Sequence, residues 1–160
     1  MTQRTRACTL VSRYTALAAT TGAIPLPAAS GAIVAENAAL IGHISAVYGL
    51  PISLEAIASS LGGAALLNLA GRALFVEGMR ALNMIGGGVA SVLVSGLGAT
   101  TAGVQTWVIG HLTIAIAENG GNPLPQPQAA EVVASAASTF SSRDHAPDES
   151  VPSTANRTAR

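Results

Sequence analysis

Two long stretches without a charged residue constrain this chain more than any other feature. Only five charged residues occur between Tyr14 and Ala117, and they leave uncharged windows of 22 residues (14–35) and 37 residues (81–117). Each window is long enough to cross the hydrocarbon layer of a bilayer, which takes roughly 20 apolar residues. Both windows are rich in Ala and Gly, which insert less readily than Leu, Ile, Val or Phe. The windows therefore permit a membrane-associated helical protein without requiring one.

The overall charge excludes several classes of function. Charged residues make up 10% of the chain and the net charge is +0, whereas a soluble domain carries about 25% charged residues. A neutral chain offers no electrostatic attraction for a phosphate backbone, so we expect no nucleic-acid partner. The chain has no Lys, and a phosphate-binding P-loop needs one after its glycines. The sequence is therefore not that of an ordinary nucleotide hydrolase.

Residue types that usually carry catalysis or metal binding are few and badly spaced. None of the three histidines (His43, His111, His145) lies four residues from another His, so the metal-ligand spacing of a helical His pair is absent. Cys8 is the only cysteine, which rules out a disulfide framework within the chain. No Asp precedes Asp144 to orient a histidine beside a serine nucleophile. We therefore expect no enzyme activity, no catalytic residues, no metal and no cofactor.

Prolines and glycines divide the chain into helices. Helical spacing of apolar residues predicts helices over 14–23, 28–48, 54–83 and 89–117. The prolines of Ile24-Pro25-Leu26-Pro27 end the first helix, Gly49 and Pro51 end the second, and Gly86-Gly87-Gly88 is a flexible joint. Ser53 is the expected N-cap of the third helix. The second helix should bury one apolar stripe, composed of Ile33, Val34, Leu40, Ile41, Ile44, Val47 and Tyr48.

These breaks predict an all-α fold: a small-residue-rich helical bundle or set of helical hairpins with a disordered C-terminal tail. A basic N-terminal segment (1–13) precedes a helical domain (14–118), a Pro-rich linker (119–128), a short amphipathic helix (129–141) and a disordered tail (142–160). The short helix should bury one face, made of Val132, Val133, Ala136, Ala137 and Phe140.

Small residues recur every fourth position through the last long helix. Such small-xxx-small spacing lets helix backbones approach closely, most often in lipid, although a tightly packed soluble helix pair uses it as well. The helix would exceed the thickness of a hydrocarbon core, so it must tilt, protrude or break, and we expect a bend at 96–98. We predict a helix-packing seam at Gly87, Ser91, Ser95, Ala99 and Gly103, with Gly110 from a neighbouring file.

Several short motifs give the chain a family resemblance. They are Ile24-Pro25-Leu26-Pro27, the sequence ISAVYGLPIS at 44–53, the sequence SLGG at 60–63, and TWVIGH at 106–111. Over about residues 10–118 the chain resembles the bacterial domain of unknown function 697. That helical domain is often found C-terminal to Era-like GTPase domains and in YcjF-type inner-membrane proteins. The resemblance implies a GTPase partner acting in trans, since this chain has no GTPase domain.

The chain departs from that family pattern in its second helix. Lys and Glu usually occupy the outer face of this helix in the family, and Asn37 stands where we expect the family's Gln. If the family fold holds, the loss of charge favours contact with lipid or with a partner surface. The outer positions here hold Ala39, Gly42, His43 and Ala46.

We therefore expect a non-enzymatic, membrane-associated helical module that packs against itself or against other membrane helices. Its partners would be membrane lipid, further copies or other helices, and the GTPase that the resemblance implies. Arg4, Arg6 and Arg13 precede the first uncharged window without an acid, which favours a cytoplasmic N-terminus at a bacterial inner membrane. Ser12-Arg13 interrupts what would be the apolar core of a signal peptide. The alternative is a cytoplasmic, soluble α-helical adaptor or small-ligand-binding bundle.

Overall fold

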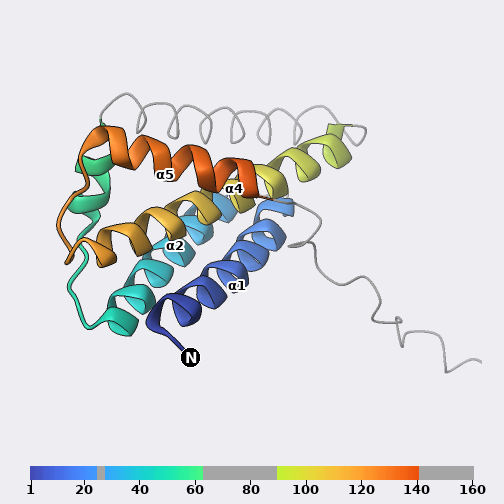
Figure 1. Ribbon diagram of the computed structural model, residues 1–160. Helices are drawn as coiled ribbons and strands as arrows, with labels where there is room; N and C mark the ends of the chain where they lie inside the picture. Colours follow the sequence, from blue (N-terminus) through green and yellow to red (C-terminus); the bar gives the residue numbers. More distant parts are fainter. Residues whose placement is uncertain (25–27, 63–89, 141–160) are drawn as a thin grey trace, which may run out of the picture.

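The computed structural model describes residues 1–24, 28–62 and 90–140, without the side chains of residues 28 and 90–98, and every regular element there is an α-helix (Figure 1). The expected all-α class is confirmed. The joint at 86–88, the helix residues 63–83 and the tail 142–160 lie outside the described residues. The helices are α1 (Gln3–Ala23), α2 (Ala28–Tyr48), a helix over residues 54–62, α4 (Ala90–Glu118) and α5 (Gln126–Thr139).

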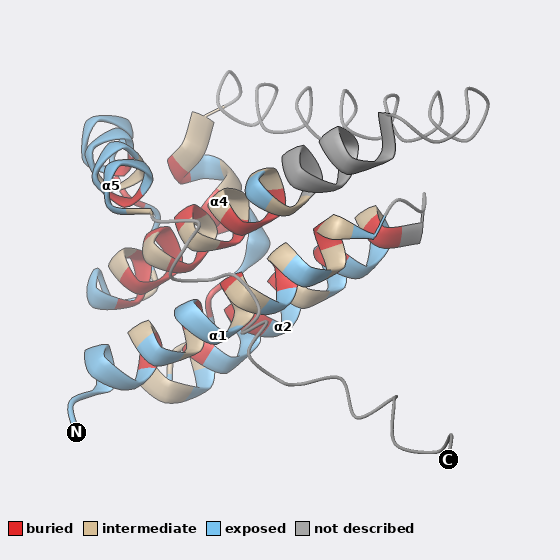
Figure 2. Cartoon of the chain, turned by 90° about the vertical axis from the view of Figure 1, so that its right-hand side faces the viewer, coloured by how far each residue is buried: buried red, intermediate tan, exposed pale blue. Residues whose placement is uncertain are grey.

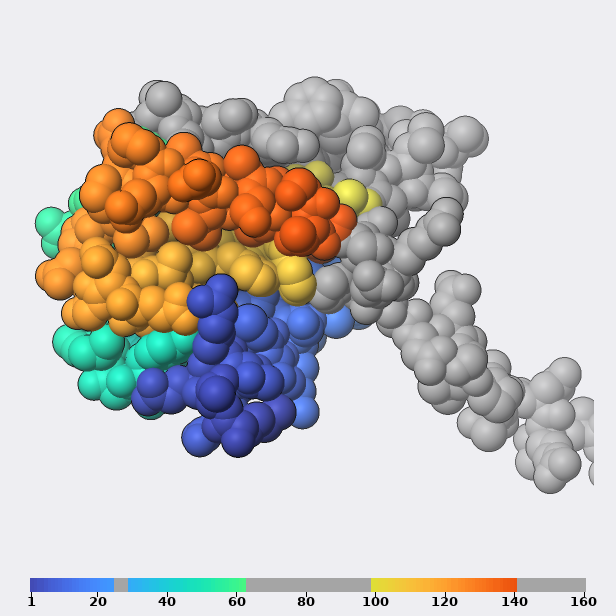
Figure 3. Space-filling view, viewed as in Figure 1, coloured from blue at the N-terminus to red at the C-terminus, as the bar shows by residue number. Residues whose placement is uncertain are grey.

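Helix α1 runs antiparallel to both α2 and α4. Arg4 at the start of α1 pairs with Glu118 at the end of α4, and Val11 packs on Gly110. Near the end of α1, Thr21 hydrogen-bonds to Glu36, which lies in the first half of α2. Helix α5 lies across α4, with α1 below it in the same view (Figure 3). One end of the bundle, which we call the base, therefore holds the start of α1 and the ends of α2 and α4; the opposite end is the tip.

Helix α1 begins at Gln3 rather than at Tyr14, so the expected basic segment 1–13 is part of the bundle. The side chain of Thr2 caps the helix by accepting a hydrogen bond from the backbone N–H of Thr5 at 3.2 Å. Ala7 and Val11 are fully buried. Their contacts in the bundle stabilise the helix although the apolar periodicity of this stretch is weak.

The ends of the helices follow from local chemistry as expected. Gly49 adopts a left-handed conformation (φ +68°) directly after α2. The hydroxyl of Ser53 caps residues 54–62 by accepting from the N–H of Ala56 at 3.1 Å. Gly120 and Gly121 (φ +71° and +82°) close α4, and the N–H of Gly121 donates to the carbonyl of Ile116 at 2.9 Å. The predictions for Gly49 and Ser53 are confirmed.

One expectation, about the linker after α4, is corrected. Helix α4 itself runs without interruption through Gly96 and Gly98, so the chain does not break there, and the expected bend stays a prediction. Helix α5 begins at Gln126, inside the expected linker, because Pro127 falls in its first turn, where a missing N–H costs no helical hydrogen bond. The shorter linker is fixed to the core where the N–H of Leu124 donates to Ser60 Oγ at 2.9 Å.

The buried faces of α2 and α5 differ from expectation at single positions. In α2, Ile33, Leu40, Ile41 and Ile44 are buried as predicted, but Val34 is 67% exposed. The polar Asn37 takes a place in the buried face, with 6% of its surface exposed. In α5, the buried residues are Ala129 and Ala136, whereas Ala137 is exposed.

Candidate functional site

Two helices approach each other closely where α4 crosses α1. A Cβ atom at Gly110 would lie 2.6 Å and 2.8 Å from the two methyl carbons of Val11. Carbon atoms in favourable contact are about 3.5–4.0 Å apart, so no side chain fits at this position. Gly110 is therefore a packing position between two helices of the same chain.

The other predicted seam residues are placed less completely. A Cβ atom at Gly103 would lie 3.2 Å from Cζ of Phe140 and 3.6 Å from Cβ of Ala19. Ala99 is half-buried. Ser91 and Ser95 belong to α4, but their side chains, like all of Gly87, lie outside the described residues. The seam therefore serves packing inside the chain at Gly103 and Gly110, and its first half stays a prediction.

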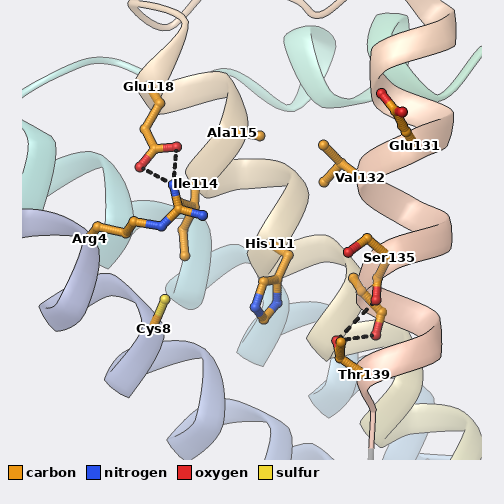
Figure 4. Close-up of a pocket in the computed structure, with 11 residues that line it drawn as sticks. Arg4, Cys8, His111, Ile114, Ala115, Glu118, Glu131, Val132, Ser135 and Thr139 are labelled. Atoms are coloured by element: carbon orange, nitrogen blue, oxygen red, sulfur yellow. Dashed lines mark hydrogen bonds and ion pairs between the residues drawn. The ribbon is translucent and has the colours of Figure 1, made fainter.

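A groove of about 380 Å³ lies between the start of α1, the second half of α4 and α5 (Figure 4). Its walls combine apolar side chains with titratable and hydroxyl groups. The sequence did not suggest this site, because Arg4 and Cys8 lie more than 100 positions before the other residues that line it. The lining residues are Arg4, Cys8, His111, Ile114, Ala115, Glu118, Glu131, Val132, Ser135, Ala136 and Thr139.

An ion pair closes the groove at the base. The guanidinium Nη1 of Arg4 donates to both carboxylate oxygens of Glu118, at 3.0 and 3.1 Å. The phenol of Tyr48 donates to Glu118 Oε1 at 3.3 Å. Partial burial, and then the Glu118 carboxylate, raise the pKa of Tyr48 above its ordinary value. This cluster joins the ends of α1, α2 and α4.

His111 presents one ring nitrogen to the groove. Its Nδ1 lies 3.0 Å from the carbonyl oxygen of Trp107, and a carbonyl only accepts, so Nδ1 carries the proton. Nε2 is then the acceptor in the neutral ring, and no described residue hydrogen-bonds to it. The Trp107 and His111 rings pack with centroids 4.4 Å apart. Trp107 Nε1 donates to the carbonyl of Ala136 at 3.0 Å and so fixes α5 to α4.

The groove lacks the arrangement of a metal centre. Among the residues that the structure describes, no three His, Cys, Asp or Glu side chains come close enough together to hold a metal ion. Cys8 is a free, half-buried thiol. The groove could accept a small molecule with one hydrogen-bond donor for His111 and an apolar body for Ile114 and Val132.

The outer side of the α1–α2 hairpin is a second candidate surface (Figure 2). Tyr14 hydrogen-bonds to His43 at 2.8 Å and Thr21 donates to Glu36 at 2.6 Å, so Leu17, which lies between them on α1, is level with Leu40 of α2, next to Ala39. From Leu17 to Ile24 on α1, and from Ala32 to Ala39 on α2, the exposed residues are uncharged. We call this surface the hairpin face and define it by Leu17, Ile24, Ala32, Ala35 and Ala39, which are all exposed. Val34, at the same end of the bundle, is exposed on a flank of α2.

Helix α2 supplies most of the hairpin face. Its stretch Ala29–Tyr48 is, among the described residues, the one long and apolar enough to cross a membrane by length and composition. Only 28% of the best window of that stretch is buried in the bundle. The four outer positions Ala39, Gly42, His43 and Ala46 are all exposed. Most of this apolar helix therefore has no partner within the described chain.

The protein has no match among known proteins in any of three comparisons: no protein-family model, no curated protein and no solved structure matches the chain. The resemblance to the domain of unknown function 697 therefore stays a prediction.

Several residues that shape these sites were not identified from the sequence. Val11 is the partner of Gly110, and the buried Thr15, Asn37 and Thr106 each have a side-chain oxygen without a hydrogen-bond partner in the part of the chain that the structure describes. Thr and Asn are common in exposed helix positions, so their sequence carries no signal of burial. Only the fold reveals that they point inward.

Proposed function

We propose that the chain is a non-enzymatic, membrane-associated helical module. The observation that carries the proposal is α2, an apolar helix long enough for a bilayer and 28% buried in the bundle. A soluble core helix of this composition would be covered by its neighbours, because exposed contiguous apolar surface favours association. Lipid is the partner that an uncharged outer face fits best.

The proposal is tested by flotation of the purified full chain with phospholipid vesicles. We expect the protein to rise with the vesicles and to resist extraction by alkaline carbonate when it is isolated from cell membranes. Protein that stays at the bottom of the gradient, and is monomeric without detergent, would overturn the proposal.

A second candidate function is small-ligand binding in the groove between α1, α4 and α5. Its support is the volume of about 380 Å³ and the acceptor nitrogen of His111 that faces no described partner. A fragment screen by ligand-observed NMR, with His111→Phe as the matched variant, tests it. Ligands that bind the wild type and the variant equally would contradict a role for this nitrogen.

The implied GTPase partner belongs to the same proposal. A module held at a membrane would bring a separate GTPase to that surface. Cross-linking in cells through Cys8, followed by mass spectrometry, would identify such a partner.

A further inference from the structure

Charged residues are distributed unequally along the bundle. Of those the structure describes, Arg4, Arg6, Glu55, Glu118 and Glu131 lie toward the base and Arg13 lies in the middle of α1. Toward the tip the described part holds one charged residue, Glu36, whose half-buried carboxylate accepts a hydrogen bond from Thr21 at 2.6 Å. The tip can therefore leave water at a much lower electrostatic cost than the base.

One stripe of α1 changes from basic to apolar along its length. Arg6, Arg13, Leu17 and Ile24 are separated by 7, 4 and 7 positions, which puts them on one face of a helix. All four are exposed. Arg6 and Arg13 form no ion pair with a described residue, so their guanidinium groups are available to anionic lipid phosphates.

The length of the apolar part matches one leaflet. Ile24 follows Arg13 by 11 positions, which at about 1.5 Å per residue is roughly 16 Å. Half of a hydrocarbon core of about 30 Å is about 15 Å. Arg13 at the level of the headgroups would place Ile24 close to the middle of the bilayer.

Apolar side chains are exposed toward the tip, while polar side chains are buried between the helices. Leu17, Ile24 and Val34 are 48%, 44% and 67% exposed. Thr15 and Thr106 in the middle of the bundle, and Asn37 toward the tip, are buried, and their Oγ1, Oγ1 and Oδ1 atoms have no hydrogen-bond partner among the described residues. Val11 on Gly110 and Ala19 near Gly103 set an antiparallel register that makes Thr15 level with Thr106. Polar side chains of membrane-embedded helices face the interior of the bundle in this way.

From these observations we infer that the tip of the α1–α2 hairpin, with the hairpin face, inserts into a single leaflet of an anionic bilayer, with Arg13 at the headgroups and the base, including Arg6, in the water beside them. The inference rests on the proposed membrane association and specifies its mode. The tip of the α1–α2 hairpin enters the bilayer from one side, and α2 does not span it.

The test compares two substitutions of equal chemistry at opposite ends of the bundle. Val34→Asp places a carboxylate at the tip, and Leu54→Asp places one at the base. The two positions are matched in exposure, since Leu54 is 65% exposed and Val34 is 67% exposed. Flotation uses the full chain and phosphatidylcholine vesicles containing phosphatidylglycerol. We expect Val34→Asp to weaken vesicle partitioning at least tenfold and Leu54→Asp to change it less than twofold. Thermal melts confirm that both variants fold, and Leu17→Asp repeats the tip substitution on α1.

The outcomes separate the inference from the proposed function. A wild-type chain that does not float refutes both. A wild-type chain that floats, with Val34→Asp and Leu54→Asp floating equally well, preserves membrane association and overturns insertion of the tip.

The depth of insertion separates one leaflet from a full span. A fluorophore is attached at Ile24→Cys or at Ala39→Cys in a Cys8→Ser chain, and lipids brominated at different depths quench it. We expect the label at position 24 to lie deeper than the label at position 39. A deeper label at position 39 would mean that α2 spans the bilayer, and the single-leaflet inference would be wrong.

Discussion

Replacing Gly110 by Ala tests the contact between α1 and α4 directly. The added Cβ atom would lie 2.6 Å from Cγ2 and 2.8 Å from Cγ1 of Val11, so one helix must move away from the other by roughly 1 Å to restore an ordinary carbon–carbon distance. Overpacking of a core typically costs 1–3 kcal/mol. Val11 is β-branched and nearly fixed in one rotamer within a helix, so it cannot turn aside and the cost falls near 3 kcal/mol. Ala also stabilises a helix by about 1 kcal/mol relative to Gly. The free energy of unfolding should therefore fall by about 2 kcal/mol in total.

The measurement is chemical denaturation followed by circular dichroism, with two control chains. Gly42→Ala has the same helix-propensity gain, but its Cβ atom meets nothing within 4 Å, so this variant should gain up to about 1 kcal/mol. Val11→Ala combined with Gly110→Ala removes the clashing methyl groups, so the double variant should be more stable than additivity of the single variants predicts. If Gly110→Ala is as stable as Gly42→Ala, the close approach of α1 and α4 is not as the structure describes it.

Three further predictions concern the base of the bundle and α5. Arg4→Gln should lower the free energy of unfolding by less than about 1 kcal/mol, because the ion pair between Arg4 and Glu118 is partly exposed to solvent. The difference between variant and wild type in denaturation curves should shrink at high salt. The pKa of Tyr48 is raised in the fold, so the unfolded chain loses the phenolic proton at a lower pH than the folded chain does. The free energy of unfolding should therefore fall as the pH rises above about 10. Tyr48→Phe should reduce this fall in thermal melts at about pH 9 to 11. Trp107→Phe removes the hydrogen bond to Ala136, at a cost of about 1 kcal/mol, and should speed amide exchange in α5; unchanged exchange would show that apolar contacts alone hold α5.

Local chemistry made the helix boundaries predictable. Gly49, Ser53 and Gly120 act through their own backbone conformation or a hydroxyl within three residues, so a sequence window contains all that is needed. The bounds of α2 follow from such residues and were predicted correctly. The same reasoning failed at the start of α1, where the buried residues Ala7, Val11, Thr15, Ala18 and Gly22 are mostly small and give no strong apolar periodicity.

The groove could not be predicted from the sequence because its residues meet only through the tertiary fold. Arg4 and Cys8 come from α1, His111 and Glu118 from α4, and neither pair has a local motif. The carbonyl of Trp107, one helical turn earlier, determines which ring nitrogen of His111 carries the proton. Whether the other nitrogen faces a groove depends on where α1 and α5 pack. Long-range placement of this kind is set by packing and not by spacing along the chain.

The two ends of the bundle are held together by different forces. Among the described residues, the cluster toward the base contains large side chains such as Leu40, Ile44, Leu112 and Ile116, which are fully buried. Each contributes about 1.5–3 kcal/mol through the hydrophobic effect in water. The cluster toward the tip contains only Ala18, Ile33 and Ala102, so it buries much less apolar area. In lipid the hydrophobic effect between helices vanishes and close packing of small residues takes its place. A bundle with a large-residue core at its charged base and a small-residue core at its uncharged tip therefore suits a boundary between water and lipid, with one end in each.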